Sequence, residues 1–444
     1  MSARTQPPGP KGHWLKGNLA EFRRDSLGFI THCAREYGDI VSLKLGPKRV
    51  YLLNHPDLIE QVLVTQNRNF IKHFITRLLQ RILGEGLLNS EADIWLRQRR
   101  LAQPAFHRSR IEAYGRVMVE FTENMLCTWK EGESRDIHVE FMRLALGIVA
   151  KTLLNADAGG EANTVASALE FLLKDFLYRW ETLFPVPRWV PTPHNLRCKR
   201  ARRSLEGTIY KYIRQGRAAG VDRGDLLSML LQVRDEDGSG MSDLQLRDQV
   251  MTLFLAGHET TANSLSWTWY LLARHPEVEA KLGKELQDVL GGRPPTVADL
   301  PRLRYTDYVV CESMRLYPPV FAFGREALQA CTLGGYEIPA GATVIMSQWI
   351  MHRHPRYFDN PEEFHPDRWA NGLLQRISKY VYFPFGGGPR ICIGNTFAMM
   401  EASLVLATLA QHYRFTLLPE PPVVPWPAVT LRPRHGILAR LQKR

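Results

Sequence analysis

A glycine-rich string that ends in a cysteine and runs directly into a helical pattern constrains this chain more than any other feature. The string is FPFGGGPRICIG (383–394), and NTFAMMEA follows it. Glycines allow backbone conformations closed to other residues and a close approach to a flat ligand. A cysteine just ahead of a helix receives backbone N–H groups and the positive helix end, which favour the thiolate. Cys392 is therefore a candidate iron ligand, and Arg390 can pair with an acidic group of the same ligand.

A second unusual string, AGHETT (256–261), lies in the middle of the longest helical pattern. Ser242 and Asp243 open this pattern, which we expect to run to about Arg274. Glutamate and threonine are costly inside an apolar helix without partners, and threonine hydroxyls can bond back to helix carbonyls. An exposed helix face that happens to carry an acid is the alternative interpretation.

The first string resembles the haem-binding loop of the cytochrome P450 family, the haem-thiolate monooxygenases, whose pattern is F-x-x-G-x-R-x-C-x-G. Phe385, Gly388, Arg390, Cys392 and Gly394 fill every fixed position of that pattern. The alternative, a buried cysteine at a glycine-rich turn, gives no reason for the whole string. The resemblance implies that Cys392 is the proximal ligand of the iron in haem b (iron protoporphyrin IX). It also implies that Phe385 packs near the sulfur and tunes the redox potential, and that Arg390 pairs with a haem propionate.

The second string is similar to the oxygen-binding motif A/G-G-x-D/E-T-T of the same family. By this resemblance, Glu259 and Thr260 form an acid–alcohol pair that relays protons to dioxygen, and Ala256 and Gly257 leave room for dioxygen. Heterolytic cleavage of the O–O bond needs two protons on the distal oxygen while the thiolate donates electron density. Such a relay therefore suits the chemistry.

The string CESMRLYPP (311–319) carries Glu312 and Arg315 at positions i and i+3 of one helical face, where they can form an ion pair. An ordinary surface pair of this kind would contribute at most about 1 kcal/mol. The pair resembles the buried ExxR pair of the family, and Arg368 in FHPDRW resembles the arginine that joins it. The resemblance implies a structural triad with no catalytic role.

Arginines near aromatic residues suggest where the haem propionates lie. Trp95 and Arg99 are one helical turn apart in WLRQRR, a pattern that also fits a solvated basic helix. They resemble the W-x-x-x-R of the family, and Arg325 in FGREA resembles another propionate-binding arginine. With Arg390, three arginines around two carboxylates are a sensible electrostatic match.

The periodicity of the chain predicts a mainly α protein with a small β region. Residues 38–54 read as a β-hairpin, residues 91–290 as mainly helical, and residues 333–347 as short strands. The family implies a triangular helical prism with the haem between the long oxygen-binding helix and the cysteine-loop helix. We expect a Pro/Gly-rich arm over residues 1–18 and a single haem-thiolate monooxygenase domain over 19–444.

Composition and charge set further expectations. No run of about 18 apolar residues and no signal peptide are visible, so we expect a soluble, cytoplasmic enzyme of bacterial type without a membrane anchor. The net charge of +12 gathers partly at residues 97–110 and 197–203. It suits a membrane surface or an acidic protein better than nucleic acid, because no nucleic-acid-binding motif accompanies it. Solvated helix faces are the alternative.

Together these features predict a cytochrome P450 monooxygenase that inserts one oxygen atom from dioxygen into a hydrophobic substrate by hydroxylation or epoxidation. Apolar residues in the expected pocket segments favour a fatty acid, terpenoid, steroid or polyketide-like substrate, with Arg77 and Arg81 as candidate carboxylate anchors. Electrons would come from a separate ferredoxin or flavodoxin with its reductase, attracted by basic residues between Arg97 and Arg110. A peroxide-driven peroxygenase and a non-enzymatic haem sensor or carrier are the alternatives, but peroxygenase relatives usually lose the acid–threonine pair and a sensor would not need it.

Overall fold

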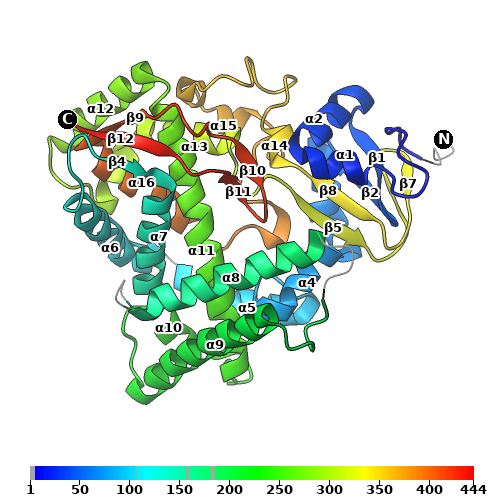
Figure 1. Ribbon diagram of the computed structural model, residues 1–444, viewed down its shortest axis with the longest axis horizontal. Helices are drawn as coiled ribbons and strands as arrows, with labels where there is room; N and C mark the ends of the chain where they lie inside the picture. Colours follow the sequence, from blue (N-terminus) through cyan, green and yellow to red (C-terminus); the bar gives the residue numbers. More distant parts are fainter. Residues whose placement is uncertain (1–5, 107, 157–159, 182–185) are drawn as a thin grey trace.

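Long helices fill most of the molecule (Figure 1). The largest sheet lies on the right of this view, and a three-stranded sheet lies on the upper left (Figure 1). The computed structural model describes residues 6–444 apart from residues 107, 157–159 and 182–185. Within the described part of the chain, no helix combines the length and apolarity needed to cross a bilayer. The prediction of a mainly α fold with a small β region is confirmed.

The α-helices are α1 Leu19–Arg24, α2 Ser26–Tyr37, α3 Pro56–Glu60, α4 Phe74–Leu83, α5 Ala92–Ala102, α6 Arg108–Leu126, α7 Ile137–Leu154, α8 Gly160–Glu181, α9 Pro193–Ala219, α10 Leu226–Gln232, α11 Asp243–Leu272, α12 Pro276–Leu290, α13 Arg304–Leu316, α14 Gln348–Met351, α15 Leu373–Arg376 and α16 Asn395–Ala410. The strands are β1 Ile40–Leu45, β2 Lys48–Leu53, β3 Phe70–Lys72, β4 Ser134–Asp136, β5 Phe323–Ala327, β6 Cys331–Leu333, β7 Tyr336–Ile338, β8 Thr343–Met346, β9 Tyr413–Leu417, β10 Pro425–Pro427, β11 Leu431–Pro433 and β12 Leu438–Lys443. Short 3-10 or π turns connect them at 61–65, 67–69, 103–106, 297–302, 366–369 and 388–390.

Helix α11 runs through the centre of the molecule (Figure 1). It begins where the sequence predicts, because the Ser242 hydroxyl accepts a hydrogen bond from the Gln245 N–H and the Gln245 side chain accepts one from the Ser242 N–H. The helix ends at Leu272, and Pro276 starts the next helix at a position that needs no N–H donor. Most of its residues are buried, so packing holds the helix in a fixed position.

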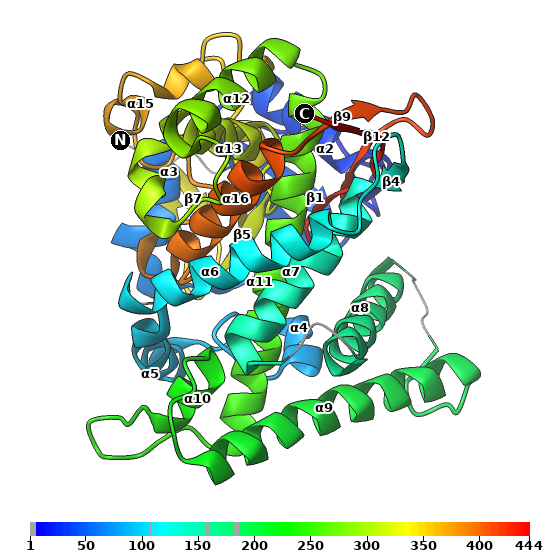
Figure 2. The same ribbon diagram turned by 90° about the vertical axis from the view of Figure 1, so that its left-hand side faces the viewer.

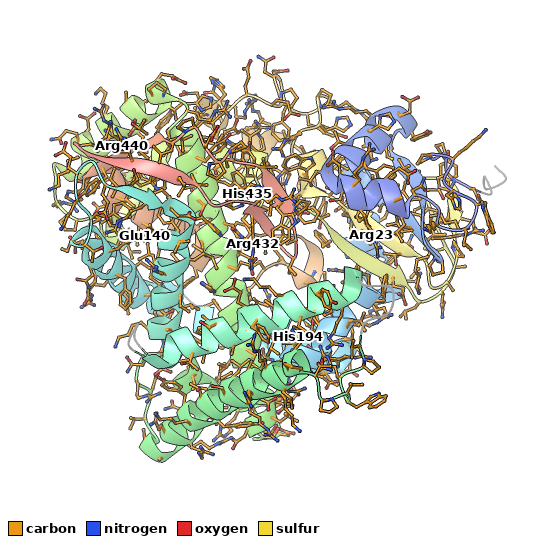
Figure 3. The ribbon with its side chains drawn as sticks, in the orientation of Figure 1. Arg23, Glu140, His194, Arg432, His435 and Arg440 are labelled. Carbon is orange, nitrogen blue, oxygen red and sulfur yellow. The ribbon has the colours of Figure 1, made fainter. Side chains whose placement is uncertain are left out.

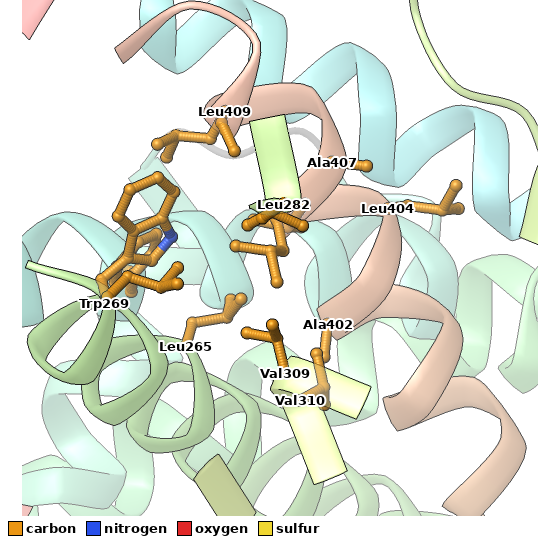
Figure 4. Close-up of a cluster of buried hydrophobic side chains, with 14 of the residues drawn as sticks. Leu265, Trp269, Leu282, Val309, Val310, Ala402, Leu404, Ala407 and Leu409 are labelled. Carbon is orange, nitrogen blue, oxygen red and sulfur yellow. The ribbon is translucent and has the colours of Figure 1, made fainter. Parts of the chain in front are cut away.

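The main core joins α11 to three other helices. Leu265 and Trp269 of α11 meet Leu282 of α12, Val309 of α13 and Leu404 of α16 (Figure 4). All five side chains are at most 1% exposed. This packing fixes α16, and with it the cysteine loop that precedes α16, relative to α11.

The largest sheet has the strand order β1-β2-β8-β5-β3. Strands β1 and β2 form the predicted hairpin, and β2 pairs with β8 in parallel. Strands β3 and β5 were not among the predicted strands. Their antiparallel register places Lys72 directly opposite Arg325, so the edge of this sheet brings two cationic residues together.

Candidate active site

A cavity lies between α11, the cysteine loop and the β5 edge of the largest sheet. Its wall includes most of the site residues predicted from the sequence: Trp95, Arg99, Ala256, Gly257, Thr260, Arg325, Phe385, Arg390, Cys392 and Gly394. Two predicted residues, Glu259 and Gly388, are not part of this wall. The wall also includes residues that the sequence did not single out, among them Lys72, Thr252, Thr261 and Ser264.

The cysteine loop is a tight backbone structure that depends on glycine. Gly386 and Gly388 have φ values of +71° and +65°, in the left-handed region. A Cβ on Gly388 would lie 2.0 Å from the Leu63 carbonyl oxygen, so a side chain there would displace the backbone. The Cys392 N–H donates to the Phe385 carbonyl over 3.0 Å, and α16 begins three residues later. Gly388 therefore shapes the loop, although it does not face the cavity.

Opposing electrostatic effects act on Cys392. Burial raises the pKa of the Cys392 thiol, while the Gly394 N–H and the positive charge of Arg99 act to lower it. The backbone N–H group thus acts in the direction that the sequence predicts, and burial acts against it. A metal cation bound to the sulfur would have to displace the proton.

Arg99 and Arg390 are anchored to the walls of the cavity. Arg99 donates from Nη1 to the Ile391 carbonyl over 2.8 Å, directly beside Cys392. Arg390 forms an ion pair with Glu91, and its guanidinium lies over the Trp95 ring at 4.5 Å from the centroid. Trp95 thus holds Arg390 in place by a cation–π contact.

Arg325 has no acidic partner among the described residues, although it is only 7% exposed. Burial, and secondarily the charge of Arg390, lower the pKa of Arg325 to about 10. Lys72 stands opposite it on β3, and burial, Arg325 and Arg390 lower the pKa of Lys72 well below its usual range. Buried cations without counter-charges are costly, so this corner calls for an anionic group.

The lining fits a flat apolar group that carries carboxylates. Four cationic residues line the cavity (Lys72, Arg99, Arg325 and Arg390), and the described part of its wall holds neither aspartate nor glutamate. The rest of the wall is mainly apolar, and it offers one thiol, that of Cys392. This donor set matches an iron porphyrin with two propionates, bound through its metal to sulfur.

Thr260 and Glu259 point in different directions from α11. Thr260 faces the cavity, and its hydroxyl bonds back to the Ala256 carbonyl over 2.5 Å, as threonines inside helices can. Glu259 is buried and is not part of the cavity wall. It accepts hydrogen bonds from Thr430 and from Arg432 Nε, the latter over 2.7 Å. Figure 3 shows Arg432 reaching toward α11 from β11.

The Glu259 carboxylate is held in its charged form. Burial acts to raise the pKa of Glu259, but the hydrogen bond and charge of Arg432 outweigh burial and lower it. The Thr430 hydroxyl also accepts a hydrogen bond from Asn263 Nδ2 over 3.0 Å. Thr430 and Arg432 could not be singled out from the sequence, because they lie 171 and 173 residues after Glu259 and meet it only in the folded chain.

The structure brings Glu312, Arg315 and Arg368 together. Glu312 and Arg315 have fully buried side chains and are joined by two hydrogen bonds of 2.8 and 2.9 Å. Arg368 Nε reaches the same carboxylate over 2.8 Å, and Trp369 Nε1 over 3.0 Å. The carboxylate therefore ties α13 to the irregular segment 358–369.

Some side chains expected to wall the substrate pocket do so, and others do not. Leu87, Leu88, Leu253, Val320 and Phe323 line the cavity. The cavity wall does not include Phe74, Ile75, Leu78, Phe176, Phe321 or Val424, and Leu183 and Phe184 lie outside the described residues. Arg77, a candidate carboxylate anchor, instead pairs with Glu326 at 2.9 Å. Arg81 is exposed.

The first basic cluster is largely neutralised within the chain. Arg97 and Arg100 both pair with Asp235, and Arg100 also pairs with Glu236. Arg110 pairs with Asp222. The side chain of Arg108 lies outside the described part of the chain. The expectation that these arginines present a free positive surface to a redox partner is therefore not supported for the three that are described.

Comparisons with known proteins agree on one family. The family model described as cytochrome P450 matches residues 7–439. Cyclooctatin synthase from Streptomyces melanosporofaciens is 38% identical over 426 residues, 95% of this chain and 92% of the relative. Cyclooctat-9-en-7-ol 5-monooxygenase from the same organism is 37% identical, over 91% and 88% of the two chains. Pentalenene oxygenase from Streptomyces avermitilis is 37% identical, over 96% and 95%. A solved cytochrome P450 haem domain superposes with a TM-score of 0.90 at 26% identity, over 100% of this chain and 99% of the other.

Proposed function

The chain belongs to the cytochrome P450 family and is a haem-dependent monooxygenase, and on this premise we propose that it oxidises a compact terpenoid-like hydrocarbon or alkenol. The observation that carries the proposal is the cavity beside Cys392, whose wall is mainly apolar apart from the threonine and serine residues of α11 and the cationic residues on the β5 side. An apolar wall selects a ligand that is mostly hydrocarbon. Two relatives are named for such compounds, pentalenene and cyclooctat-9-en-7-ol.

Thr252 and Ser264 belong to the cavity wall, but their hydroxyl oxygens are buried away from the open space and have no hydrogen-bond partner among the described residues. A substrate hydroxyl would reach either oxygen only after a change of side-chain rotamer. We therefore favour a substrate with few polar groups over a fatty acid, whose carboxylate would have to compete for cations that the haem propionates need.

The haem in this proposal is haem b, held by non-covalent contacts and one sulfur ligand. Cys392 would hold the haem through its sulfur, and Lys72, Arg99, Arg325 and Arg390 would neutralise the propionates. The sequence contains no CxxC pair for a covalent attachment of the c type. When bound, the haem supplies dioxygen activation and the transfer of one oxygen atom.

The chain itself supplies proton handling and the exclusion of water. Thr260 Oγ1 is the proton donor that faces the cavity, and its hydroxyl can leave the Ala256 carbonyl to donate there. Glu259 would first take up a proton on the side of its carboxylate that faces Thr430, and it would then release Arg432. The protonated Glu259 would return a proton to Thr260. The apolar wall keeps other protons away from the reacting atoms.

Electrons would come from a separate ferredoxin or flavodoxin with its reductase. The net charge of +12 favours an acidic partner. Because Arg97, Arg100 and Arg110 are already paired, we assign less of this attraction to them than to exposed residues such as Arg376 and Lys379.

The substrate proposal is tested by a ligand panel with the purified ferric holoenzyme. Cyclic terpene hydrocarbons and alkenols, fatty acids and steroids would each be titrated while the Soret band is followed. We expect a low- to high-spin shift with the terpenes, and oxygenated product when ferredoxin, reductase and NADPH are added. A shift with fatty acids alone would contradict the substrate class. Turnover with hydrogen peroxide as fast as with the reductase system would favour the peroxygenase alternative.

The proton relay is tested by Thr260→Ala, with Thr268→Ala as the matched control. Thr268 lies on the same helix and bonds back to the Ser264 carbonyl over 2.8 Å, but it does not line the cavity. We expect Thr260→Ala to lower the fraction of NADPH electrons recovered in product by about tenfold, with the balance released as peroxide. The Thr268→Ala control should recover the same fraction of NADPH electrons in product as the wild type. Equal coupling in both variants would remove Thr260 from the relay.

A further inference from the structure

Helix α9 carries a charged surface that neither the cavity nor the core explains. Its basic residues are Arg197, Lys199, Arg200, Arg202, Arg203, Lys211, Arg214 and Arg217, against one acid, Glu206. Leu205, Ile209 and Ile213 bury one face of the helix against its neighbours α8, α10 and α11. Figure 2 shows α9 along the lower edge of the molecule. No described residue of the cavity wall belongs to α9.

The positive charge is free at the beginning of this helix and compensated further along it. Arg197, Lys199, Arg200 and Arg203 are exposed, and none of them pairs with an acid among the residues that the structure describes. Arg202, by contrast, pairs with Glu206 at 3.0 Å. The first turns of α9 therefore present four uncompensated charges on the surface, in contrast to the paired arginines between 97 and 110.

Exposed apolar side chains lie immediately beside these charges. Trp189 is 84% exposed, Val186 is 50% exposed, and Leu196 is 42% exposed. A tryptophan is normally buried over much of its surface, so an exposure of this size next to other apolar residues indicates a contact surface. The two kinds of side chain form one surface, which we call the 186–203 patch.

The patch is held in shape by hydrogen bonds from side chains to its backbone. Arg179 of α8 donates from Nη1 to the Val186 carbonyl over 2.7 Å, and Asn195 Nδ2 donates to the Val190 carbonyl over 2.8 Å. These bonds fix the backbone on both sides of Trp189. The exposed indole of Trp189 therefore projects from a turn whose backbone is fixed by hydrogen bonds.

The brace centres on the buried carboxylate of Asp175. It accepts hydrogen bonds from Arg179 over 2.7 Å, Arg188 over 3.1 Å and His194 over 2.8 Å, which ties α8, the turn and α9 together. Figure 3 labels His194 near the beginning of α9. Cys198 lies close enough to Asp175 and His194 for the three to hold a metal ion. The two arginines already neutralise the carboxylate and would repel a cation, so this cluster is an ion-pair brace and not a metal site.

We propose that the 186–203 patch binds the enzyme peripherally to the surface of a bilayer that contains anionic lipids. Trp189 and Val186 would enter the interfacial region, where an indole finds both an apolar and a wet side. Arg197, Lys199, Arg200 and Arg203 would lie over the lipid phosphates. An acidic protein would match the charges but would leave the rigidly presented Trp189 without an apolar medium. The proposal is independent of the substrate class, although an apolar substrate would be concentrated at such a surface.

The test is co-sedimentation of the holoenzyme with vesicles of phosphatidylcholine, alone or with phosphatidylglycerol, at low and high salt. We expect binding to the anionic vesicles only, and its loss at high salt. Each basic residue near an anionic surface contributes roughly a fivefold factor. The variant R197Q/K199Q/R200Q/R203Q should therefore bind about 100-fold or more weakly, and Trp189→Ser should bind about tenfold more weakly.

The matched control is R23Q/R24Q/R302Q/R304Q, which removes the same charge from exposed residues near other helices. It should bind vesicles nearly like the wild type and show the same Soret spectrum as the patch variants. Equal loss in both quadruple variants would mean that net charge alone drives binding, and would overturn the assignment of the patch. Wild-type vesicle binding in the patch variants, with weaker binding of an acidic ferredoxin, would overturn the lipid assignment in favour of a protein partner.

Discussion

The pKa values of two buried glutamates, Glu259 on α11 and Glu401 on α16, are shifted in opposite directions. Arg432 lowers the pKa of Glu259, whereas burial raises the pKa of Glu401 well above its usual range. Glu401 is 1% exposed and hydrogen-bonded to Thr261, and its Oε1 has no partner among the described residues. Burial therefore favours the neutral form of Glu401, next to a residue of the cavity wall.

This difference predicts that replacing glutamate by glutamine changes the stability of the protein in opposite directions at the two positions. Because the pKa of Glu401 is raised by folding, its contribution to stability is full at low pH and is lost as the pH rises above the ordinary value for a glutamate. Glu401→Gln keeps the shape and cannot ionise, so it should remove this loss and gain stability relative to wild type as the pH rises above about 5. Thermal unfolding across that range measures the effect.

The control for Glu401→Gln is Glu259→Gln, which removes the negative charge that pairs with Arg432. Folding lowers the pKa of Glu259, so its contribution is present at neutral pH and is lost as the pH falls through the folded value. The variant should be less stable than wild type at pH 7 and similar to it in acid. A Glu401→Gln protein with the same pH profile as wild type would show that Glu401 is charged in the fold.

At the residue scale, short sequence motifs predicted the side chains that line the cavity better than the residues that contact those side chains. Cys392, Arg390 and Thr260 belong to strings whose composition is unusual over ten residues or fewer. Lys72 and Arg432 sit in short segments without such a composition, and they reach the site through sheet register or a long-range ion pair. Their electrostatic roles depend on tertiary contacts, which one sequence does not encode locally.

Among the secondary-structure elements, α13 is tied to the rest of the fold by one carboxylate. Glu312 accepts hydrogen bonds from Arg315, Arg368, Trp369 and the His365 N–H. Glu312→Gln would leave two buried guanidinium groups without their counter-charge. We expect a loss of about 3–5 kcal/mol in the free energy of unfolding.

The matched control is Asp288→Asn on α12, whose partner is Lys284 at i−4. Both side chains of this pair are more than half exposed, so the loss should stay below about 0.5 kcal/mol. Denaturant unfolding of the holoenzyme compares the two variants. Similar losses for both would mean that the triad is no more than a surface ion pair.

Helix boundaries could be predicted from the sequence where capping residues and prolines mark them. Short strands could not be predicted in this way. Ser242 and Pro276 delimit α11 and α12 as predicted. Residues 19–37 form two helices, α1 and α2, because the Asp25 side chain accepts a hydrogen bond from the Gly28 N–H and starts α2 anew. Strands β3 and β5 are three and five residues long and make sense only as partners within the sheet.

At the scale of the whole molecule, the unpaired charge of Arg325 predicts that replacing this residue changes the stability of the apoprotein and the affinity for haem in opposite directions. In the apoprotein the guanidinium is buried beside Arg390 and Lys72 without a counter-charge. Arg325→Met should therefore raise the stability of the apoprotein by about 1 kcal/mol while weakening haem binding by about tenfold. Unfolding of the apoprotein and haem transfer to apomyoglobin measure the two effects.

Arg353→Met provides the comparison, because Arg353 is also buried but pairs with Glu362 at 3.2 Å. Its replacement should destabilise the protein with and without haem. An Arg325→Met apoprotein that is less stable than wild type would mean that Arg325 serves the fold and not the haem.

The central claim is that Cys392 places a thiolate on the haem iron. The direct measurement is the spectrum of the ferrous carbon monoxide complex for wild type, Cys392→Ser and Cys127→Ser, the last an exposed cysteine that does not line the cavity. We predict the long-wavelength Soret band of thiolate ligation in wild type and in Cys127→Ser. In Cys392→Ser that band should disappear while haem is still bound. A thiolate band that persists in Cys392→Ser would contradict the account.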